Sequence, residues 1–349
     1  MRFVIYAVNV HQGGGAALLI PLLSSIGQSQ ITCMAFLDAR LILPETPSSK
    51  IQIFRIAPNI LNRLLAELTL IKTAKAGDVV LSFGNLPPLF KLDAKALLFI
   101  QNRYLIDDIS LKHFYIKTRL RITLERLWLK LFCKNVDTII VQTPSMQSCV
   151  SKHLGRDAVV LPYIDAINVF NRSLSKTEDA ETKYDFVYVA SGDPHKNHKQ
   201  LVEAWVLLAA EGIFPVLCLT LSEQNSRELV SWISNQVKTH SLKIVNVGFV
   251  ASSVLAELYT EAKAMIYPST LESFGLPLIE ARNANLAIVA SELDYVRDVI
   301  DPEETFDPSS PKSIARAVKR FLGYPEKNLP LVDPKSFLEY CINKKTEVK

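Results

Sequence analysis

The chain has 349 residues, more than one ordinary hydrophobic core accommodates, so we expect two α/β domains. Hydrophobic residues make up 49% of the sequence and charged residues 21%, a balance that excludes long disordered stretches. The net charge of +4 is too small to indicate a nucleic-acid coat, so an anionic partner would have to meet a local basic patch.

The first half of the chain predicts a parallel sheet covered by helices. Residues 3–10 form an apolar run typical of a buried strand, and three glycines at 13–15 then open a helix over 16–26. Further strands are predicted at 31–37, 78–82, 96–100, 138–142 and 158–161. Because strands and helical stretches alternate, residues 1–170 are predicted to form an N-terminal Rossmann-like domain.

The same pattern restarts in the second half of the chain. Residues 171–182 are polar and without periodicity, which predicts a linker. Strands follow at 186–189, 216–221, 244–247, 264–267 and 287–290, with helices at 199–210 and 227–239. Residues 183–325 are therefore predicted to form a second doubly wound domain, and the two domains are expected to face a central cleft. We expect residues 326–349 to form a C-terminal helix or tail that packs back on the first domain.

The most informative run is PSTLESFGLPLIEA, residues 268–281. Pro277 stands where the first turn of a helix tolerates a missing N–H, and Gly275 lets the backbone come close to a ligand. The free N–H groups of such a turn can hold a phosphate. Glu272 and Glu280 flank this anion site, and carboxylates accept hydrogen bonds from the paired hydroxyls of a ribose or a hexose. Acidic residues that merely favour the helix dipole are the alternative interpretation.

This run, placed after a strand in a second α/β domain, resembles glycosyltransferase family 4, the retaining family with the GT-B fold, in its bacterial surface-polysaccharide or O-antigen type. The resemblance implies that Glu272 contacts the donor sugar as a catalytic residue and that Glu280 holds the ribose. It also implies that the amides of Phe274, Gly275 and Leu276 contact the sugar and the diphosphate. Residues 183–325 would then bind the nucleotide sugar and residues 1–170 the acceptor. The likeness is strong over 183–320 and general over 1–170.

A second motif, VYVASGDPHKNHKQLVEAW, covers residues 187–205. Lys196 follows a predicted strand, and an ammonium there can neutralise a diphosphate and stabilise it as it leaves. A solvated loop lysine is the alternative. The family has an arginine five residues earlier, where this chain has Ser191. Stabilisation of the leaving group would therefore rely on Lys196, backbone amides and His195 or another residue.

The glycine loop NVHQGGG, residues 9–15, lies between a predicted strand and a helix. The resemblance places this loop beside the donor phosphates and the acceptor, with Gly14 and Gly15 as the expected contacts. His11 is a candidate ligand from the same loop, and a structural histidine is the alternative.

The glycine loop also raises the alternative of a dinucleotide-binding fold. Gly13 and Gly15 match the first two glycines of G-x-G-x-x-G, and Asp38 stands where a ribose-binding acid would sit. The third glycine position is Leu18, however, and this interpretation leaves the motif at 268–281 unexplained.

Two segments depart from the family pattern. Gln101, Asn102 and Arg103 stand where many members place a histidine near the acceptor. Gln and Asn can bond hydroxyls but cannot act as a base, and Arg103 would either meet an anionic acceptor or form a surface salt bridge. Asp298 replaces a frequent glutamate, a difference expected to affect a loop and not the chemistry.

A basic, amphipathic stretch covers residues 112–134. Its basic residues are Lys112, Lys117, Arg119, Arg121, Arg126, Lys130 and Lys134, against the single acid Glu125. Its interleaved apolar residues are Phe114, Tyr115, Leu120, Leu124, Leu127, Trp128, Leu131 and Phe132. Such a helix can lie on an anionic membrane surface, whereas a core helix with a solvated basic face is the alternative. No nucleic-acid-binding module accompanies the patch, so no nucleic-acid partner is expected.

The remaining features predict a cytoplasmic protein. The five cysteines are scattered and never spaced C-x-x-C, which fits a reducing compartment and argues against a zinc site or a disulfide framework. We expect no signal peptide before the first strand, and no apolar run is long enough to span a membrane. The protein is therefore expected to be peripheral on the inner face of the bacterial cytoplasmic membrane.

Together these features predict a retaining, metal-independent hexosyltransferase. The resemblance implies a nucleotide-diphosphate sugar as donor and a polyprenyl-diphosphate-linked glycan as acceptor, in O-antigen or capsule synthesis. GDP-mannose and UDP-hexosamines both stay open as donors. Because no D-x-D motif occurs, neither a metal nor another cofactor is expected. The alternatives are a soluble GT-B enzyme with a non-lipid acceptor and a non-catalytic protein that binds sugar nucleotides, the latter suggested by Ser191 and the missing histidine.

Overall fold

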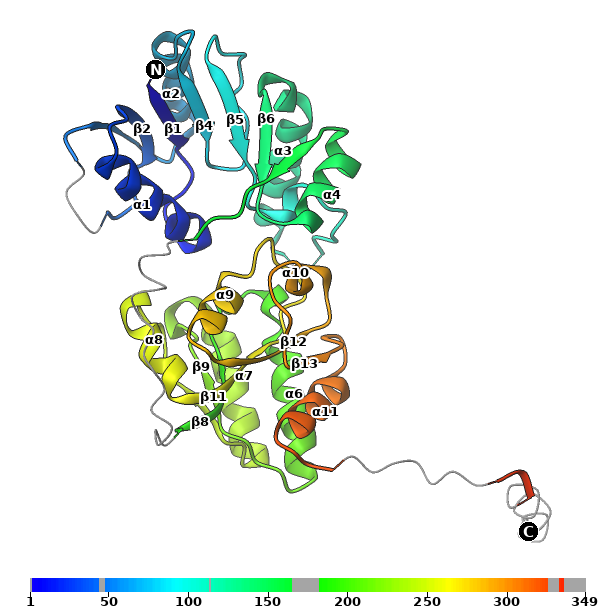
Figure 1. Cartoon of the computed structure of the whole chain (residues 1–349). Coiled ribbons are helices and arrows are strands. Elements are labelled where there is room, and N and C mark those ends of the chain that lie inside the picture. The colour runs from blue at the N-terminus through cyan, green and yellow to red at the C-terminus, as the bar shows by residue number, and fades with distance from the viewer. Residues whose placement is uncertain (1, 44–47, 113, 165–181, 326–332, 336–349) are drawn as a thin grey trace.

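The computed structural model describes residues 2–43, 48–112, 114–164, 182–325 and 333–335. Over these residues the chain forms two α/β lobes, one from each half of the sequence (Figure 1). The predicted linker 171–182 lies outside the described residues except for its last residue. The predicted tail 326–349 lies outside them except for 333–335. The domain boundaries and the packing of the tail stay predictions.

Within the described residues, seven parallel strands form the first sheet, in the order β3-β2-β1-β4-β5-β6-β7. Their bounds are β1 Phe3–Ala7, β2 Cys33–Asp38, β3 Ile51–Ile56, β4 Val79–Ser82, β5 Lys95–Phe99, β6 Thr138–Val141 and β7 Ala158–Val160. The sequence predicted every one of these strands except β3. That strand lies at the edge of the sheet, and its half-buried side chains include Gln52 and Arg55, so its apolar run is interrupted.

The first sheet is covered by helices on both faces. These helices are α1 Gly13–Gln28, α2 Ile60–Thr73, α3 Ile116–Phe132 and α4 Pro144–Leu154. Alternate residues of β1 point to opposite faces: Ile5 belongs to the core under α1, and Val4 to the core under α2. Val80, under α2, pairs in register with Ala96, which belongs to the core under α3 and α4. Helices α2, α3 and α4 therefore share one face of the sheet, opposite α1.

Within the described residues, the second sheet has six parallel strands in the order β10-β9-β8-β11-β12-β13. Their bounds are β8 Tyr184–Tyr188, β9 Leu217–Leu219, β10 Ile244–Asn246, β11 Ala262–Tyr267, β12 Ala287–Ser291 and β13 Glu304–Phe306. The helices are α6 His198–Ala210, α7 Glu223–His240, α8 Ser252–Thr260, α9 Leu276–Asn283, α10 Asp294–Arg297 and α11 Pro311–Phe321. Strand β13 was not predicted because it is short and begins with a glutamate. Strands β8 and β11 are neighbours, so the loops that follow them meet at one edge of the sheet.

The two lobes meet through loops at this edge. The Thr143 hydroxyl donates to the carbonyl of Ser273 at 3.3 Å, and the backbone N–H of Ser145 donates to the Asp298 carboxylate at 2.9 Å. Ser145 lies in the first turn of α4, where a carboxylate is also favoured by the helix dipole. Asp298 therefore joins the two domains, a role that its place in a variable loop did not reveal.

Candidate functional site

Lys196 and Glu272, which lie far apart in the sequence, form an ion pair at the carboxyl edge of the second sheet. The Lys196 Nζ lies 2.5 Å from Glu272 Oε1, and the two side chains are only 15% and 13% exposed. The same carboxylate oxygen accepts hydrogen bonds from the Tyr267 hydroxyl at 3.0 Å and the Ser269 hydroxyl at 2.7 Å. The two predicted catalytic residues are thus brought together, and Glu272 is held by three donors.

The lysine loop is fixed to the glutamate loop by backbone bonds as well. Lys196 ends a single 3₁₀ turn, η3 Pro194–Lys196, and Asn197 then reverses the chain with a φ of +62° before α6 begins. The Asn197 side-chain amide donates to the carbonyls of Pro268 at 3.1 Å and Pro308 at 2.7 Å. The N–H of Thr270 donates to the His195 carbonyl at 2.8 Å. These bonds place the ammonium next to the carboxylate without relying on the ion pair itself.

Three buried tyrosines hold the loops of the ion pair in place through hydrogen bonds and ring contacts. The Tyr188 hydroxyl donates to the Lys196 carbonyl at 2.7 Å, and the Tyr295 hydroxyl donates to the Ser269 carbonyl at 2.7 Å. The Tyr267 ring lies between the other two, with ring centroids 5.7 Å from Tyr188 and 6.5 Å from Tyr295. Burial, followed by the charge of Glu272, raises the pKa of all three hydroxyls well above 10, so they remain neutral donors.

The sequence did not single out these tyrosines, although their positions carried a weak signal. Tyr188 and Tyr267 are the last residues of the neighbouring strands β8 and β11, and Tyr295 lies on α10. An aromatic residue at the end of a buried strand is normally read as core packing. Only a hydroxyl that needs a partner when buried distinguishes such a tyrosine from a phenylalanine.

The turn before α9 has the predicted geometry. Gly275 has a φ of +76° and precedes the helix, and Pro277 lies in its first turn. A Cβ on Gly275 would lie 3.1 Å from Leu278 Cδ1, so glycine is required for both conformation and space. Among the described residues, no side chain caps this helix end. The Phe274 side chain is buried, and Leu276 packs against the apolar core of the first domain, so the amides rather than these side chains remain for a ligand.

Glu280 lies in the second turn of α9. Its carboxylate accepts a hydrogen bond from the Tyr259 hydroxyl at 3.4 Å, and burial raises the pKa of Glu280 above its usual value. Glu272 bonds to the lysine loop, whereas Glu280 lies next to α8. The two carboxylates therefore have different partners within the protein, and their two ligand roles stay predictions.

Ser191 and His195 lie on the loop that leads to Lys196. The exposed Ser191 hydroxyl donates to the Asp193 carboxylate at 2.6 Å. The His195 ring contacts Tyr104 of the first domain edge-on, with centroids 5.8 Å apart. Burial, followed by the charge of Lys196, lowers the pKa of His195, and its Nδ1 has no hydrogen-bond partner among the described residues. His195 is therefore a neutral group with an unused polar atom at the contact between the domains.

On the first domain, the glycine loop lies beside Gln101. A Cβ on Gly15 would lie 3.1 Å from Val10 Cγ1 and 3.8 Å from Gln101 Oε1, whereas one on Gly14 would meet no described atom within 4 Å. His11 is half-buried, and its Nδ1 lacks a partner among the described residues. The structure thus brings Gly15 and Gln101 together, and it leaves the ligand role of His11 a prediction.

The dinucleotide alternative loses its ribose-binding acid in the structure. Asp38 is fully buried and forms an ion pair with Arg40 at 2.8 Å. The Arg40 side chain, the largest influence, lowers the pKa of Asp38. Its carboxylate is therefore occupied within the protein.

Gln101 and Asn102 are largely engaged in holding their own loop. The Asn85 side-chain oxygen accepts the N–H groups of Gln101 at 2.6 Å and Asn102 at 2.9 Å. The Gln101 amide donates to the Phe83 carbonyl at 3.1 Å, and the Asn102 oxygen accepts the N–H of Tyr104 at 3.1 Å. Both side chains therefore shape the loop, and any acceptor contact by them stays a prediction.

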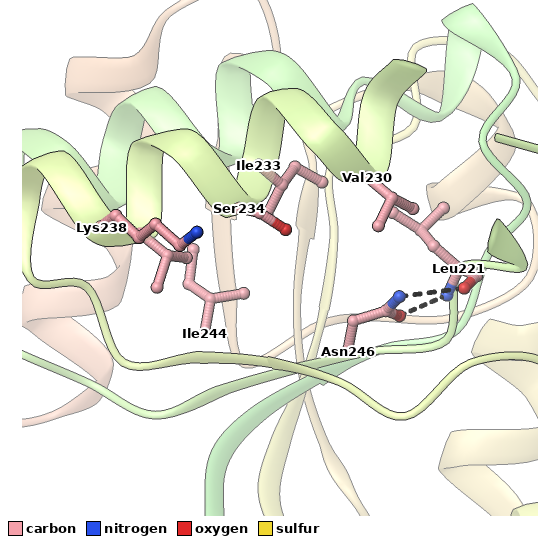
Figure 2. Close-up of a pocket in the computed structure, with 8 residues that line it drawn as sticks. Leu221, Val230, Ile233, Ser234, Lys238, Ile244 and Asn246 are labelled. Atoms are coloured by element: carbon pink, nitrogen blue, oxygen red, sulfur yellow. Dashed lines mark hydrogen bonds between the residues drawn. The ribbon is translucent and has the colours of Figure 1, made fainter. Parts of the chain in front are cut away.

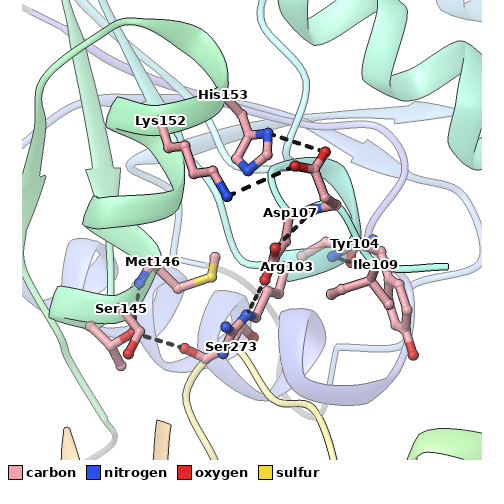
Figure 3. A network of polar contacts seen from close by, with 12 residues as sticks. Arg103, Tyr104, Asp107, Ile109, Ser145, Met146, Lys152, His153 and Ser273 are labelled. Atoms are coloured by element: carbon pink, nitrogen blue, oxygen red, sulfur yellow. Dashed lines mark hydrogen bonds and ion pairs between the residues drawn. The ribbon is translucent and has the colours of Figure 1, made fainter. Parts of the chain in front are cut away.

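Arg103 begins a 3₁₀ turn, η1 Arg103–Leu105, and forms an ion pair with Asp107 at 2.8 Å. Of its two predicted roles, the salt bridge is the one found, although the pair is four-fifths buried rather than on the surface. Figure 3 shows Arg103 and Asp107 near Ser145 and Ser273, where the two domains meet.

Helix α3, within the predicted basic stretch, buries Ile122 and Leu129 but exposes a row of other apolar residues. The exposed apolar residues of α3 are Ile116, Leu120, Leu124, Leu127 and Leu131. Their helical spacing places them on one side, with basic residues flanking them. The core-helix alternative is wrong for these residues. Arg126 differs from the other basic residues, because it turns inward and donates to the carbonyls of Tyr104 at 2.7 Å, Asp107 at 2.9 Å and Ile109 at 3.3 Å.

A pocket of about 220 Å³ lies between α7, strand β10 and the segment that follows β9 (Figure 2). The side chain of Asn246 exchanges two hydrogen bonds with the backbone of Leu221 there, at 2.9 and 3.0 Å. Apolar residues such as Ile233 form most of the wall, and none of the predicted site residues lines it.

Within the described residues, no group of three or more His, Cys, Asp or Glu side chains is arranged to bind a metal. No helix of this part of the chain is long and apolar enough to cross a bilayer.

Comparisons with known proteins agree with this geometry. Residues 170–331 match the family described as "Glycosyl transferases group 1". The chain is 28% identical over 145 residues to the "Serotype-specific mannosyltransferase WbdA" of Escherichia coli, covering 41% of this chain and 18% of WbdA. It is 24% identical over 206 residues to the "O-antigen chain mannosyltransferase RfbU" of Salmonella typhimurium, covering 58% of this chain and 55% of RfbU. The chain therefore matches at most about half of the length of these two relatives.

Solved structures share the fold over almost the whole chain. Sucrose-phosphate synthase from Thermosynechococcus elongatus superposes with a TM-score of 0.69 at 17% identity, covering 93% of this chain and 90% of that one. Anabaena HepE in complex with UDP and glucose superposes with a TM-score of 0.64 at 15% identity, covering 92% and 90%. The family match includes Lys196, Glu272 and Glu280, in agreement with the resemblance to glycosyltransferase family 4. The chain thus carries a glycosyl transferases group 1 domain on a two-domain GT-B fold.

Proposed function

We propose that the protein transfers a hexosyl group from a nucleotide-diphosphate sugar to an acceptor hydroxyl, with retention of the anomeric configuration and without a metal. The observation that supports this best is the buried pair of Lys196 and Glu272 beside the uncapped start of α9. One cation, one carboxylate and a set of free amides are what a pyrophosphate-linked sugar requires.

In this proposal, binding of the donor separates Lys196 from Glu272, and each of the two side chains then contacts the donor instead. The Lys196 ammonium leaves Glu272 for the diphosphate and stabilises the negative charge that grows as the glycosidic bond breaks. Glu272 then accepts hydrogen bonds from the sugar hydroxyls, and Glu280 accepts them from the ribose. The amides at Phe274, Gly275 and Leu276 bind the remaining oxygens. The leaving phosphate assists in removing the proton of the acceptor hydroxyl on the same face of the sugar, so no separate nucleophile is required.

In the same proposal, the other candidate residues have supporting roles. Neutral His195 and Ser191 lie on the loop of Lys196 and contact the diphosphate in place of the arginine of the family, and the Ser191 hydroxyl gives up its bond to Asp193 to do so. Gly14 and Gly15 approach the phosphates from the first domain. His11, Gln101, Asn102 and Arg103 lie on the acceptor side.

The acceptor in this proposal is a polyprenyl-diphosphate-linked glycan of O-antigen or capsule synthesis. Both relatives are named as mannosyltransferases, which favours mannose among the candidate sugars. The O-antigen chain in the name of RfbU supports this class of acceptor. GDP-mannose is therefore the first donor to test and UDP-hexosamines the second. The exposed apolar and basic residues of the 112–134 stretch support peripheral binding at the inner face of the cytoplasmic membrane.

The experiment measures nucleotide release from GDP-mannose and UDP-N-acetylglucosamine in the presence of bacterial membrane extract. Lys196→Met should lower the rate by roughly 10²- to 10³-fold, because the leaving diphosphate loses its cation. Lys243→Met is the matched control, since Lys243 is an exposed lysine of the same domain. Equal rates for wild type and Lys196→Met would refute the assignment. Tight nucleotide binding without release from either donor would favour the non-catalytic alternative, and release with a water-soluble acceptor alone would favour the soluble one.

A further inference from the structure

Helix α2 has an exposed apolar side that the transfer reaction does not use. Its first residue, Ile60, is 88% exposed and Leu61 is 67% exposed, although both are large aliphatic side chains. The exposed apolar residues of α2 are Ile60, Leu61, Leu64, Leu65 and Leu68. A helix on the surface of a soluble domain normally places such residues against the core. Several of them together on one exposed side indicate an interaction surface.

The buried side of α2 shows that the helix cannot rotate to bury its exposed leucines. Ala66, Glu67 and Leu70 are the buried residues of the helix, so a charged residue is buried while leucines are exposed. The Glu67 carboxylate accepts the backbone N–H of Leu89 at 3.1 Å, which satisfies one of its oxygens. A rotation of α2 that buried its leucines would break this bond and remove Leu70 from the core.

Helices α2 and α3 lie side by side on the same face of the first sheet, joined through the loop at residues 87–89. Glu67 of α2 binds Leu89, and the Trp128 indole of α3 donates to the Pro87 carbonyl at 2.9 Å. Asn135, just after α3, donates to the carbonyls of Pro88 at 3.0 Å and Leu89 at 2.9 Å. Phe90, which follows this loop, is itself 45% exposed. The apolar sides of both helices are therefore parts of one region of the molecule.

We propose that α2 and α3 together form one lipid-binding surface, in which α2 supplies an apolar wedge and α3 supplies both apolar contact and attraction to anionic headgroups. This two-helix surface consists of the exposed apolar residues of α2 and α3 and of Phe90. The exposed basic residues of the stretch are Lys112, Lys117, Arg119, Arg121, Lys130 and Lys134.

Charge decides between lipid and a second copy of the chain as the occupant. An isologous dimer through this surface would bring the same basic residues of two copies together. An anionic bilayer complements both parts of the surface, since leucines enter the boundary of the acyl chains and lysines or arginines remain at the headgroups. This inference rests on the membrane binding in the proposed function and extends it to α2, and it does not depend on the transfer reaction.

The test is flotation of the full-length protein with vesicles of phosphatidylglycerol and phosphatidylcholine, and with vesicles of phosphatidylcholine alone. The triple variant Leu61→Gln, Leu65→Gln, Leu68→Gln should bind the anionic vesicles roughly tenfold more weakly than wild type, at high salt as well as at low salt. The variant Lys117→Gln, Arg121→Gln should lose only the part of the binding that salt also removes. The control is Leu207→Gln, because Leu207 is an exposed leucine of the second domain with an exposure of 41%.

Folding is checked by thermal unfolding, and a Leu→Ala version of the triple variant gives a milder change at the same positions. Nucleotide binding in solution should be unchanged in all of these variants, which separates a failure of this surface from a failure of the proposed reaction. Wild-type binding by both triple variants would overturn the proposal. So would a wild-type dimer, seen by analytical ultracentrifugation, that the triple variant converts to a monomer.

Discussion

The candidate site depends most directly on the carboxylate of Glu272. Its Oε1 accepts one ammonium and two hydroxyl donors, which come from the Lys196 loop, the end of β11 and the loop that follows β11. A carboxylate held in this way has one orientation, so a sugar that binds to it meets a preorganised acceptor. The tyrosine hydroxyls below it contribute positioning rather than chemistry.

Tyr267→Phe should therefore lower the transfer rate without destroying the fold. The variant removes one of the hydroxyl donors of Glu272, a loss of about 1 kcal/mol that corresponds to roughly a fivefold lower rate. Steady-state kinetics and thermal unfolding measure the two effects. Tyr163→Phe is the control, since its hydroxyl donates to the Leu18 carbonyl away from both glutamates. A rate unchanged by Tyr267→Phe would show that Lys196 and Ser269 alone hold the carboxylate.

His198 predicts a pH dependence of stability. It is the first residue of α6, and its ring packs against the Tyr188 ring at a tilt, with the ring centroids 4.8 Å apart. Burial lowers the pKa of His198 to about 3. The unfolded chain takes up a proton near the ordinary value of 6.5, whereas the folded chain does not until pH falls to about 3. The contribution of neutral His198 to stability is therefore complete above pH 6.5 and is lost as pH falls from 6.5 towards 3.

The measurement is chemical unfolding of wild type and His198→Phe across that pH range. Phenylalanine keeps the ring against Tyr188 but does not titrate. Wild type should lose about 1.4 kcal/mol per pH unit relative to the variant. Parallel curves for the two proteins would contradict the assignment of His198 as a buried neutral group.

At the scale of elements, the start of α9 is the feature that positions the predicted phosphate site. Gly275→Ala should reduce both stability and nucleotide affinity, because the alanine must adopt a φ of +76° and its Cβ would lie 3.1 Å from Leu278 Cδ1. We expect a stability loss of about 1–2 kcal/mol and a shift of the helix amides.

Gly212→Ala provides a control with the same backbone conformation. Gly212 also has a φ of +76°, but no described atom lies within 4 Å of its Cβ position. The Gly212→Ala variant should therefore be less stable than wild type by about 1 kcal/mol and should bind nucleotides as wild type does. Calorimetric titration with UDP and GDP tests both variants, and equal affinities in the two would argue against a ligand at the start of α9.

Sequence patterns predicted most elements because both sheets are parallel and buried on both faces. Continuous apolar runs such as Phe3–Ala7 are hard to mistake, whereas the edge strand Ile51–Ile56 and the short Glu304–Phe306 lack such runs. For α3 the helical period was visible, but the same period fits a core helix and a surface helix. Only the tertiary contacts of Trp128 and Arg126 show which side of α3 faces the protein.

The candidate site was predictable residue by residue but not as an arrangement. The motif around Gly275 named Glu272, and a separate motif named Lys196. Their direct contact depends on the pairing of β8 with β11, which local patterns do not encode. The same reason explains why Asp298 was treated as a loop residue, since its partner Ser145 belongs to the other domain.

At the scale of the whole molecule, the Asp298 contact predicts how the two domains are held. Asp298→Ala removes the acceptor for the Ser145 N–H at the first turn of α4 and should loosen the domain contact. We expect a larger radius of gyration by small-angle X-ray scattering and slower transfer, with nucleotide affinity almost unchanged. Asp294→Ala is the control, because Asp294 is an exposed residue at the start of α10, the short helix that ends just before Asp298. Identical scattering profiles for Asp298→Ala and wild type would contradict this role.

Arg126 connects a surface helix to the contact between the two lobes. Its guanidinium, on α3, donates to three carbonyls of the segment that contains Tyr104, and the Tyr104 ring contacts His195 of the other lobe. These bonds connect α3 directly to the aromatic contact between the lobes, without passing through the sheet. In the proposed membrane-bound state, this single side chain would therefore couple the position of α3 at the lipid surface to the position of the Lys196 loop.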